Sequence, residues 1–303
     1  MRTSRALPFL LVAPALIMIA LVQLYPGIYT VFLSTQEMNN GVQSFTGGDN
    51  YRLVFNSTAF SESAWHTAIF ITGYIALTMT LALGLALLLN RKLKLSGVYL
   101  ALLFIPWVLS DVIVGLVWKL FVDPQSGIFS PLLELPIFGL EGSALLTKVP
   151  EFRFIDSIPF PPAPAMTYLI MAATWKALPF ITLLILAALQ TVPKEVLESA
   201  QIDGASSRQS FWGITFPLVL PSVIVALFNL ILGGMNGVGM VFSLTGGGPG
   251  SSTEVLSFLL YTIGFSQLDF GRAAALSVFI AAINLALIIL ALRVSRRGAE
   301  QYA

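Results

Sequence analysis

The sequence predicts an all-α polytopic membrane protein with six transmembrane helices, and three observations support this. Of its 303 residues, 56% are hydrophobic and only 10% are charged, with a mean hydropathy of +0.86. Soluble domains carry roughly 25% charged residues, so this chain could not cover a soluble surface. Six apolar runs reach the roughly 20 residues that a helix needs to cross a bilayer. The 16 basic and 15 acidic residues leave no basic excess for binding nucleic acid.

The six predicted spans occupy residues 7–32, 64–89, 96–122, 165–192, 216–238 and 273–294. Together they make the whole chain, 1–303, a single transmembrane domain. The first run follows Arg2 and Arg5, as it would in a signal peptide. It is longer than the 7–15 apolar residues of a signal-peptide core, so we predict an uncleaved first span.

The distribution of basic residues predicts that both termini are cytoplasmic, because Lys and Arg concentrate on the inner side of membrane proteins. With this topology four basic residues lie outside and two lie within spans. The reverse topology would place ten basic residues outside and only four inside. The ten basic residues predicted to lie inside are Arg2, Arg5, Arg91, Lys92, Lys94, Lys194, Arg208, Arg293, Arg296 and Arg297.

A proline-rich extracytoplasmic loop is predicted at 123–164, which holds eight of the chain's 17 prolines. Proline fixes φ and removes a hydrogen-bond donor, so this loop should consist of extended chain or short helices. It could be a plain spacer or a docking surface for an extracellular partner.

The segment 193–217, between the fourth and fifth spans, predicts two short cytoplasmic helices joined by a turn. Pro193 suits a first helical turn, and Gly204 can adopt the left-handed conformation that ends a helix. Ser206 and Gln209 form an S-x-x-Q capping box for a second helix, and Pro217 is tolerated where the next span begins. A re-entrant or interfacial amphipathic helix is the alternative.

This segment resembles the EAA loop of ABC importer permeases. The matching positions are Glu198-Ser199-Ala200, Asp203-Gly204-Ala205, Ile214 with nine residues between it and Gly204, and Pro217. Ser199 replaces the usual second alanine. A further match, Ser243-Leu-Thr-Gly-Gly-Gly-Pro249, resembles the carbohydrate (maltose-type) branch, and within it the larger of the two permease partners.

The resemblance implies half of a translocation pore in a bacterial-type inner membrane. It implies a second homologous permease subunit, two ATPase subunits that bind ATP and magnesium, and an external solute-binding protein. The chain has no Gly-Lys dipeptide and hence no Walker A phosphate-binding loop, so no cofactor or metal is expected in it. The residues implied to contact the ATPase are Glu198, Ser199, Ala200, Asp203, Gly204, Ala205, Ile214 and Pro217.

Two ionisable residues fall at mid-depth, where charges are costly and usually functional. Asp111 lies 11 residues from Val122 at the outer end of its span, and Lys176 lies 11 residues from Ala165 at the outer end of another. At ~1.5 Å per residue both lie roughly 16 Å below the outer boundary, so we predict that they pair. The alternative is that each faces a wet cavity alone.

Other residues suit a sugar pathway, because amides bind hydroxyls and aromatic faces contact sugar rings. Asn229 and Asn284 lie near mid-depth, although asparagine also links helices by hydrogen bonds. The glycine-dense run 233–239 could bend to line the pore mouth and expose Asn236, or could pack helices tightly. The tentative pathway residues are Asp111, Trp175, Lys176, Phe228, Asn229, Asn236 and Asn284.

These observations favour a permease subunit of an ATP-driven importer of a sugar or related polyol. A self-contained secondary transporter or channel, with Asp111 and Lys176 coupling ions, is the main alternative. An enzyme is not expected. The chain has no cysteine, His66 is its only histidine, and Asp111 is its only mid-membrane carboxylate, so no catalytic group can be assembled.

Overall fold

The computed structural model describes residues 7–39, 42–91, 94, 96–123, 127–128 and 164–300. The predicted proline-rich loop at 123–164 lies almost entirely outside the described residues, as do Arg2, Arg5 and Lys92. The chain forms two compact units, which we describe separately. The first contains residues 1–61 and 259–283, and the second contains residues 62–258 and 284–303.

In the first unit, the predicted first span is one long helix that contains a π-helical turn. This turn directly precedes Pro26, and the N–H of Tyr25 donates to the carbonyl of Ala20. Proline leaves a helical carbonyl without its usual donor, and a wider turn accommodates that defect. The elements of this unit are α1 (Leu7–Ile19), η1 (Ala20–Leu24), α2 (Tyr25–Leu33), β1 (Gln36–Asn39), β2 (Val42–Phe45), α3 (Asp49–Phe55), η3 (Thr262–Ser266) and the first part of α15 (Phe270–Glu300).

A two-stranded antiparallel hairpin in the first unit was not predicted from the sequence. Its strands have four residues each, too few to show a clear alternation of apolar side chains. The buried Asn50 amide donates to the carbonyls of Ser34 (2.9 Å) and Gln36 (2.8 Å). A long-range contact therefore fixes the hairpin against α3.

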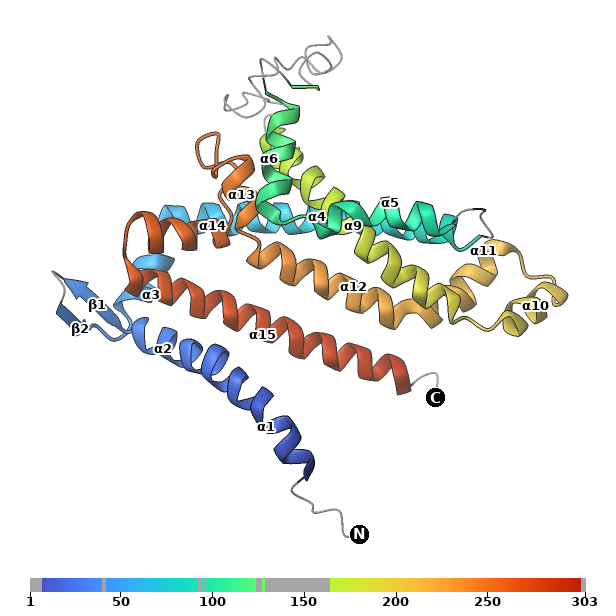
Figure 1. Ribbon diagram of the computed structural model, residues 1–303, viewed down its shortest axis with the longest axis horizontal. Helices are drawn as coiled ribbons and strands as arrows, with labels where there is room; N and C mark the ends of the chain where they lie inside the picture. The colour runs from blue at the N-terminus through green and yellow to red at the C-terminus, as the bar shows by residue number, and fades with distance from the viewer. Residues whose placement is uncertain are drawn as a thin grey trace. The chain divides into compact units, whose positions relative to one another are not determined.

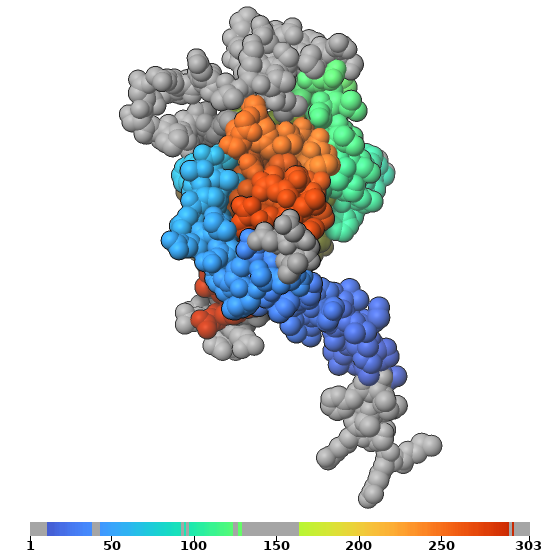
Figure 2. Space-filling view, turned by 90° about the vertical axis from the view of Figure 1, so that its left-hand side faces the viewer, coloured from blue at the N-terminus to red at the C-terminus, as the bar shows by residue number. Residues whose placement is uncertain are grey.

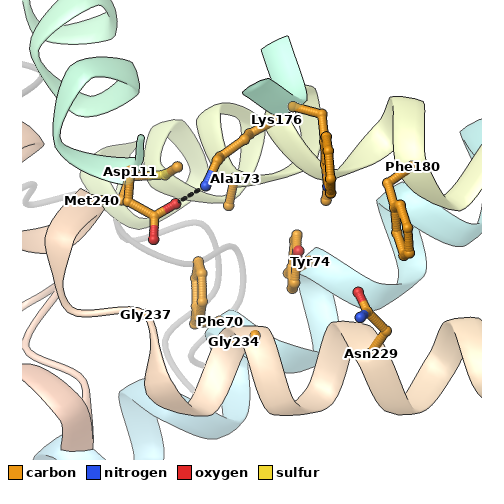
Figure 3. A pocket seen from close by; sticks show the side chains of 13 residues that line it. Phe70, Tyr74, Asp111, Ala173, Lys176, Phe180, Asn229, Gly234, Gly237 and Met240 are labelled. Atoms are coloured by element: carbon orange, nitrogen blue, oxygen red, sulfur yellow. Dashed lines mark hydrogen bonds and ion pairs between the residues drawn. The ribbon is translucent and has the colours of Figure 1, made fainter. Parts of the chain in front are cut away.

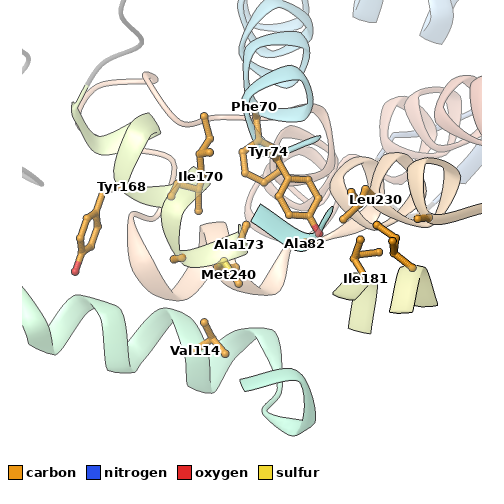
Figure 4. Close-up of a cluster of buried hydrophobic side chains, with 14 of the residues drawn as sticks. Phe70, Tyr74, Ala82, Val114, Tyr168, Ile170, Ala173, Ile181, Leu230 and Met240 are labelled. Atoms are coloured by element: carbon orange, nitrogen blue, oxygen red, sulfur yellow. The ribbon is translucent and has the colours of Figure 1, made fainter. Parts of the chain in front are cut away.

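The second unit is built around α9 (Pro164–Gln190), which contributes more buried residues than any other described helix. Buried Thr174 of α9 accepts a hydrogen bond from Thr78 at 3.2 Å, and the Tyr168 hydroxyl donates to the carbonyl of Trp118 at 2.7 Å. Figure 4 shows apolar side chains converging around this helix. The other elements of the second unit are α4 (Thr58–Leu89), α5 (Ser96–Val108), α6 (Asp111–Phe121), α10 (Lys194–Ile202), α11 (Ser207–Ser210), η2 (Phe211–Thr215), α12 (Phe216–Asn236), α13 (Gly239–Leu244) and the start of α14 (Leu256–Tyr261).

Among the described residues, five helices are long and apolar enough to span a membrane, and a sixth span is a bent pair. The continuous helix predicted over 96–122 is wrong, because α5 and α6 meet at 98° (Figure 1). Pro106 removes a helical hydrogen bond, and the extended Ser110 (ψ 155) starts a new helix by accepting the N–H of Ile113. These two residues are stop and start signals within one apolar run.

The second predicted cytoplasmic helix also differs from expectation, because it does not end before the fifth span. Residues Ser207–Asn236 form one helix, which includes the π-helical turn η2 just before Pro217. The N–H of Phe216 donates to the carbonyl of Phe211, five residues back. A π-helical turn, like the one before Pro26, therefore makes α11 and α12 continuous.

Candidate functional site

Six helices of the second unit surround a cavity of about 200 Å³. Its lining includes four aromatic side chains, the polar side chains of Asp111, Lys176 and Asn229, and a glycine-rich edge (Figure 3). Such a combination of apolar surface and a few directed polar groups is typical of binding sites for small molecules. The lining residues are Phe70, Tyr74, Trp107, Asp111, Ala173, Lys176, Ala177, Phe180, Asn229, Gly233, Gly234, Gly237 and Met240.

Asp111 and Lys176 form the predicted ion pair within this cavity (Figure 3). The Lys176 side chain is 23% exposed and that of Asp111 is 40% exposed, so both retain access to the cavity. The pair is therefore confirmed, but the depth argument that predicted it assumed one straight span over 96–122. The 98° bend between α5 and α6 removes that assumption.

Breaks in two helices lie beside this pair. Asp111 is the first residue of α6, and Gly237 (φ −77, ψ 90) ends α12 before α13 begins at Gly239. A Cβ on Gly239 would lie 3.2 Å from the Asp111 Cβ. The two half-helices pack closely, since a Cβ on Gly115 of α6 would overlap the Ser243 hydroxyl of α13. They adjoin at the surface in Figure 2, where α6 is green and α13 is orange.

The glycine-dense run both lines the cavity and packs closely against a neighbouring helix. Gly233, Gly234 and Gly237 line the cavity, and their place at a pore mouth stays a prediction. Gly234 also packs tightly against α4, because a Cβ there would lie 3.2 Å from Ile71. Asn236 is exposed, but its side chain donates to the Leu232 carbonyl (2.7 Å) and accepts from Asn284 (3.1 Å).

Of the seven tentative pathway residues, the structure brings Asp111, Lys176 and Asn229 to the cavity. The other four do not line it: Trp175 packs edge to face on Trp118 and Phe228 is half-buried, while Asn236 and Asn284 bond to one another. A role for these four in the pathway stays a prediction.

Sequence reasoning missed several walls of the cavity. On α9 the lining residues are Ala173, Lys176, Ala177 and Phe180, which follow the i, i+3, i+4, i+7 spacing of one helix face. Extending the Lys176 face by one turn would have found Phe180. No comparable signal marked Phe70, Tyr74 or Met240, because they reach the cavity through tertiary packing.

The coupling segment, residues 193–217, has the predicted local geometry at its turn. Gly204 has φ +81, and the capping box is present. The Ser206 N–H donates to Gln209 Oε1 at 2.8 Å, and the Gln209 N–H donates to Ser206 Oγ at 3.4 Å. Pro193 precedes the first helical turn instead of occupying it. No residue of α10 or α11 is buried, and Ile202 is 86% exposed, so this segment presents a free surface.

A glycine-rich loop follows α13 and contains the second sequence match. Buried Thr253 donates to the Gly248 carbonyl at 2.8 Å, and its N–H donates to the Gly247 carbonyl at 3.1 Å. At the end of the loop, burial and the nearby Glu62 carboxylate raise the pKa of Glu254. The loop is thus a fixed connection, closed by its own hydrogen bonds.

Comparison with known proteins identifies the class to which this fold belongs. Residues 78–299 match the family of binding-protein-dependent transport system inner membrane components, and the chain belongs to that family. It is therefore a multi-pass permease subunit of an ABC importer and not an enzyme. This membership also decides against the self-contained secondary transporter.

Relatives of the whole chain are about equally similar to it. The trehalose/maltose transport system permease protein MalF of Thermococcus litoralis is 32% identical over 96% of this chain and 94% of its own. The sn-glycerol-3-phosphate permease protein UgpA of Agrobacterium fabrum is 31% identical over 94% and 92%. The sulfoquinovosyl glycerol permease protein SmoG of the same organism is 31% identical over 97% and 91%.

A solved structure shows the same fold. It is a bacterial ABC transporter involved in the import of the acidic polysaccharide alginate, at 23% identity and a TM-score of 0.77. The match covers 96% of this chain and 95% of that one.

Proposed function

We propose that this chain forms half of the translocation pathway of an ATP-driven importer for a sugar or related polyol. The observation that carries the proposal is the cavity, in which the Asp111–Lys176 pair and Asn229 lie between aromatic walls. Relatives are named for trehalose and maltose, glycerol phosphate and sulfoquinovosyl glycerol, all of them polyhydroxylated compounds.

The size of the cavity supports a pathway shared between two subunits. Its volume of about 200 Å³ is below the roughly 300–1,000 Å³ of typical ligand pockets. A second homologous permease subunit facing this one would complete the site. An external solute-binding protein would deliver the solute to it from the side opposite the cytoplasmic termini.

The energy source in this proposal is a pair of ATPase subunits that bind ATP and magnesium and dock on the coupling segment. The continuous helix Ser207–Asn236 supports this role. It begins at the turn containing Gly204 and carries Asn229 and Gly233 to the cavity. A displacement of its cytoplasmic end would therefore move one wall of the cavity.

Reconstitution of the complete importer tests the proposal. The chain should copurify with its ATPase partner and support ATP-driven uptake of a sugar in proteoliposomes. Gly204→Asp should abolish uptake while ATP hydrolysis continues, because it adds bulk and charge at the turn. Gly48→Asp, at an exposed position in the first unit, adds the same groups elsewhere and should leave uptake unchanged. Normal uptake by Gly204→Asp with the partner still bound would refute the coupling role.

A further inference from the structure

The cavity contains a feature that similarity to relatives does not explain. A permease named for trehalose and maltose and one named for glycerol phosphate resemble this chain equally, at 32% and 31% identity. The first solutes are uncharged and the second is an anion, so overall similarity does not discriminate between them. The charged residues that line the cavity do discriminate between uncharged and anionic solutes.

We infer that Asp111 sets the charge selectivity of the pathway: by neutralising Lys176 it makes the cavity accept uncharged polyols and exclude anionic solutes. This inference rests on the proposed function, because it assumes that the solute passes through this cavity. The excluded solutes are phosphate esters, sulfonates and carboxylates.

The charges in the cavity are balanced. Among the described residues that line it, Lys176 is the only cation and Asp111 the only carboxylate, and they are paired. An unpaired lysine at this position would attract anions. Because the Asp111 carboxylate neutralises the Lys176 ammonium, Lys176 offers hydrogen-bond donors to the solute without a net positive field.

The structure also holds Asp111 in place beside its partner. It is the first residue of α6, where the helix dipole favours a negative charge, and Ser110 caps the same turn. Its Cβ lies close to the backbone of Gly239, because a Cβ added there would be only 3.2 Å from it. The carboxylate is thus positioned by α6 and α13, and not by Lys176 alone.

An anionic solute would encounter two penalties. An anion that replaced Asp111 on Lys176 would leave a carboxylate unpaired in a partly desolvated site. An anion bound to the donors that Lys176 keeps free would lie beside the Asp111 carboxylate, which places two negative charges together. Either arrangement disfavours the anion without affecting an uncharged solute.

An uncharged polyol can use the intact pair. A carboxylate has about four acceptor positions and an ammonium has three donors, so most remain available after one contact between them. Asn229 adds an amide that both donates and accepts. Two stacked aromatic pairs supply apolar walls for the carbon faces of a sugar ring: Phe70 with Tyr74 (5.6 Å between centroids) and Trp107 with Phe180 (5.4 Å).

Binding to the complete importer, assembled in lipid nanodiscs without ATP, tests this inference. The probes are inorganic phosphate and two matched pairs, glucose with glucose 6-phosphate and glycerol with glycerol 3-phosphate. The wild type should bind the uncharged member of each pair about tenfold more tightly. Asp111→Asn should shift this ratio by about tenfold toward the phosphate ester and gain binding of inorganic phosphate. Lys176→Gln should not gain binding of inorganic phosphate.

The control is Asp269→Asn, which removes the same charge from the Asp269–Arg272 pair in the first unit and should behave as the wild type. If Asp111→Asn does not assemble, Asp111→Ser removes the same charge with a smaller polar side chain. An unchanged ratio in the neutralised variant, wild-type preference for the phosphate esters, or no binding of any probe would overturn the inference. ATP-driven uptake by the wild type is measured separately, and its absence would count against the proposed function instead.

Discussion

The coupling segment and the cavity are both polar interruptions of an apolar chain, yet they are stabilised differently. The shape of the coupling segment comes from contacts between residues at most five apart, around Gly204 and the Ser206–Gln209 capping box. The cavity depends on residues far apart in the sequence, since Asp111 and Lys176 are separated by 65 positions. Substitutions should therefore destabilise the cavity more than the coupling segment, although both can impair transport.

One element joins the two regions. The helix Ser207–Asn236 starts in the coupling segment and ends at the glycines that line the cavity. A locally determined turn can thus control a site that is determined by tertiary packing. The predictions below test this contrast, from the largest expected effect to the smallest.

The largest effect is expected where α6 and α13 touch. Gly115→Ala should lower the free energy of unfolding by about 3 kcal/mol, because its Cβ would overlap Ser243 Oγ and lie 3.1 Å from the Met240 carbonyl. Thermal unfolding in detergent measures this. Ser243→Ala should partly rescue it by removing the hydroxyl. Gly84→Ala, which meets no atom within 4 Å, should be neutral or slightly stabilising. Equal stability of the two alanine variants would contradict the packing.

The ion pair should have the next largest effect. Asp111→Asn and Lys176→Gln should each lower the free energy of unfolding by about 2 kcal/mol. This lies between the values for exposed and buried ion pairs, since both side chains are partly exposed. The double variant should cost less than the two single changes together. Additive costs in this double-mutant cycle would show that the pair contributes no coupling energy.

At Gly204 the effect on stability should be smaller and the effect on transport large. A residue other than glycine at φ +81 costs about 1–2 kcal/mol, although a Cβ there meets no atom within 4 Å. Gly204→Val should therefore impair uptake by altering the turn. Gly204→Asn should retain more uptake, because asparagine tolerates this conformation. If both variants transport equally, the backbone conformation of the turn is not what matters.

The smallest effect is expected at the capping box. Ser206→Ala removes the acceptor for the Gln209 N–H and should lower the stability of the local helix by about 1 kcal/mol. The change should appear as faster hydrogen exchange in α11, with little change in overall melting temperature. Ser207→Ala is a control within the first helical turn. Loss of the global fold in Ser206→Ala would contradict the view that this segment is stabilised locally.

The same contrast explains what the sequence could predict. The stop at Gly204 and the start at Ser206 depend on neighbouring residues, and both are confirmed. The Asp111–Lys176 pair was predicted from equal residue spacing to two expected span ends, and the pair is confirmed. The equal depth assumed in that prediction is not, because α5 and α6 meet at 98°.

The bends and walls of the cavity were less predictable. Pro106 and Ser110 lie inside an uninterrupted apolar run, which hydropathy alone assigns to one straight span. Whether such local signals produce a bend depends on the space that Gly115 and Gly239 leave for neighbouring helices. Phe70 and Tyr74 reach the cavity through the packing of α4 against α9 and α12.

The central claim is that the coupling segment controls the cavity, and thiol accessibility at Asn229 tests it most directly. The chain contains no cysteine, so Asn229→Cys introduces a single thiol into the cavity wall. In the assembled importer, ATP should change the labelling rate by a membrane-impermeant thiol reagent about fivefold or more. Adding Gly204→Val should remove this response while the ATPase remains bound. A labelling rate that ATP does not alter, or an equal response with and without Gly204→Val, would contradict the claim.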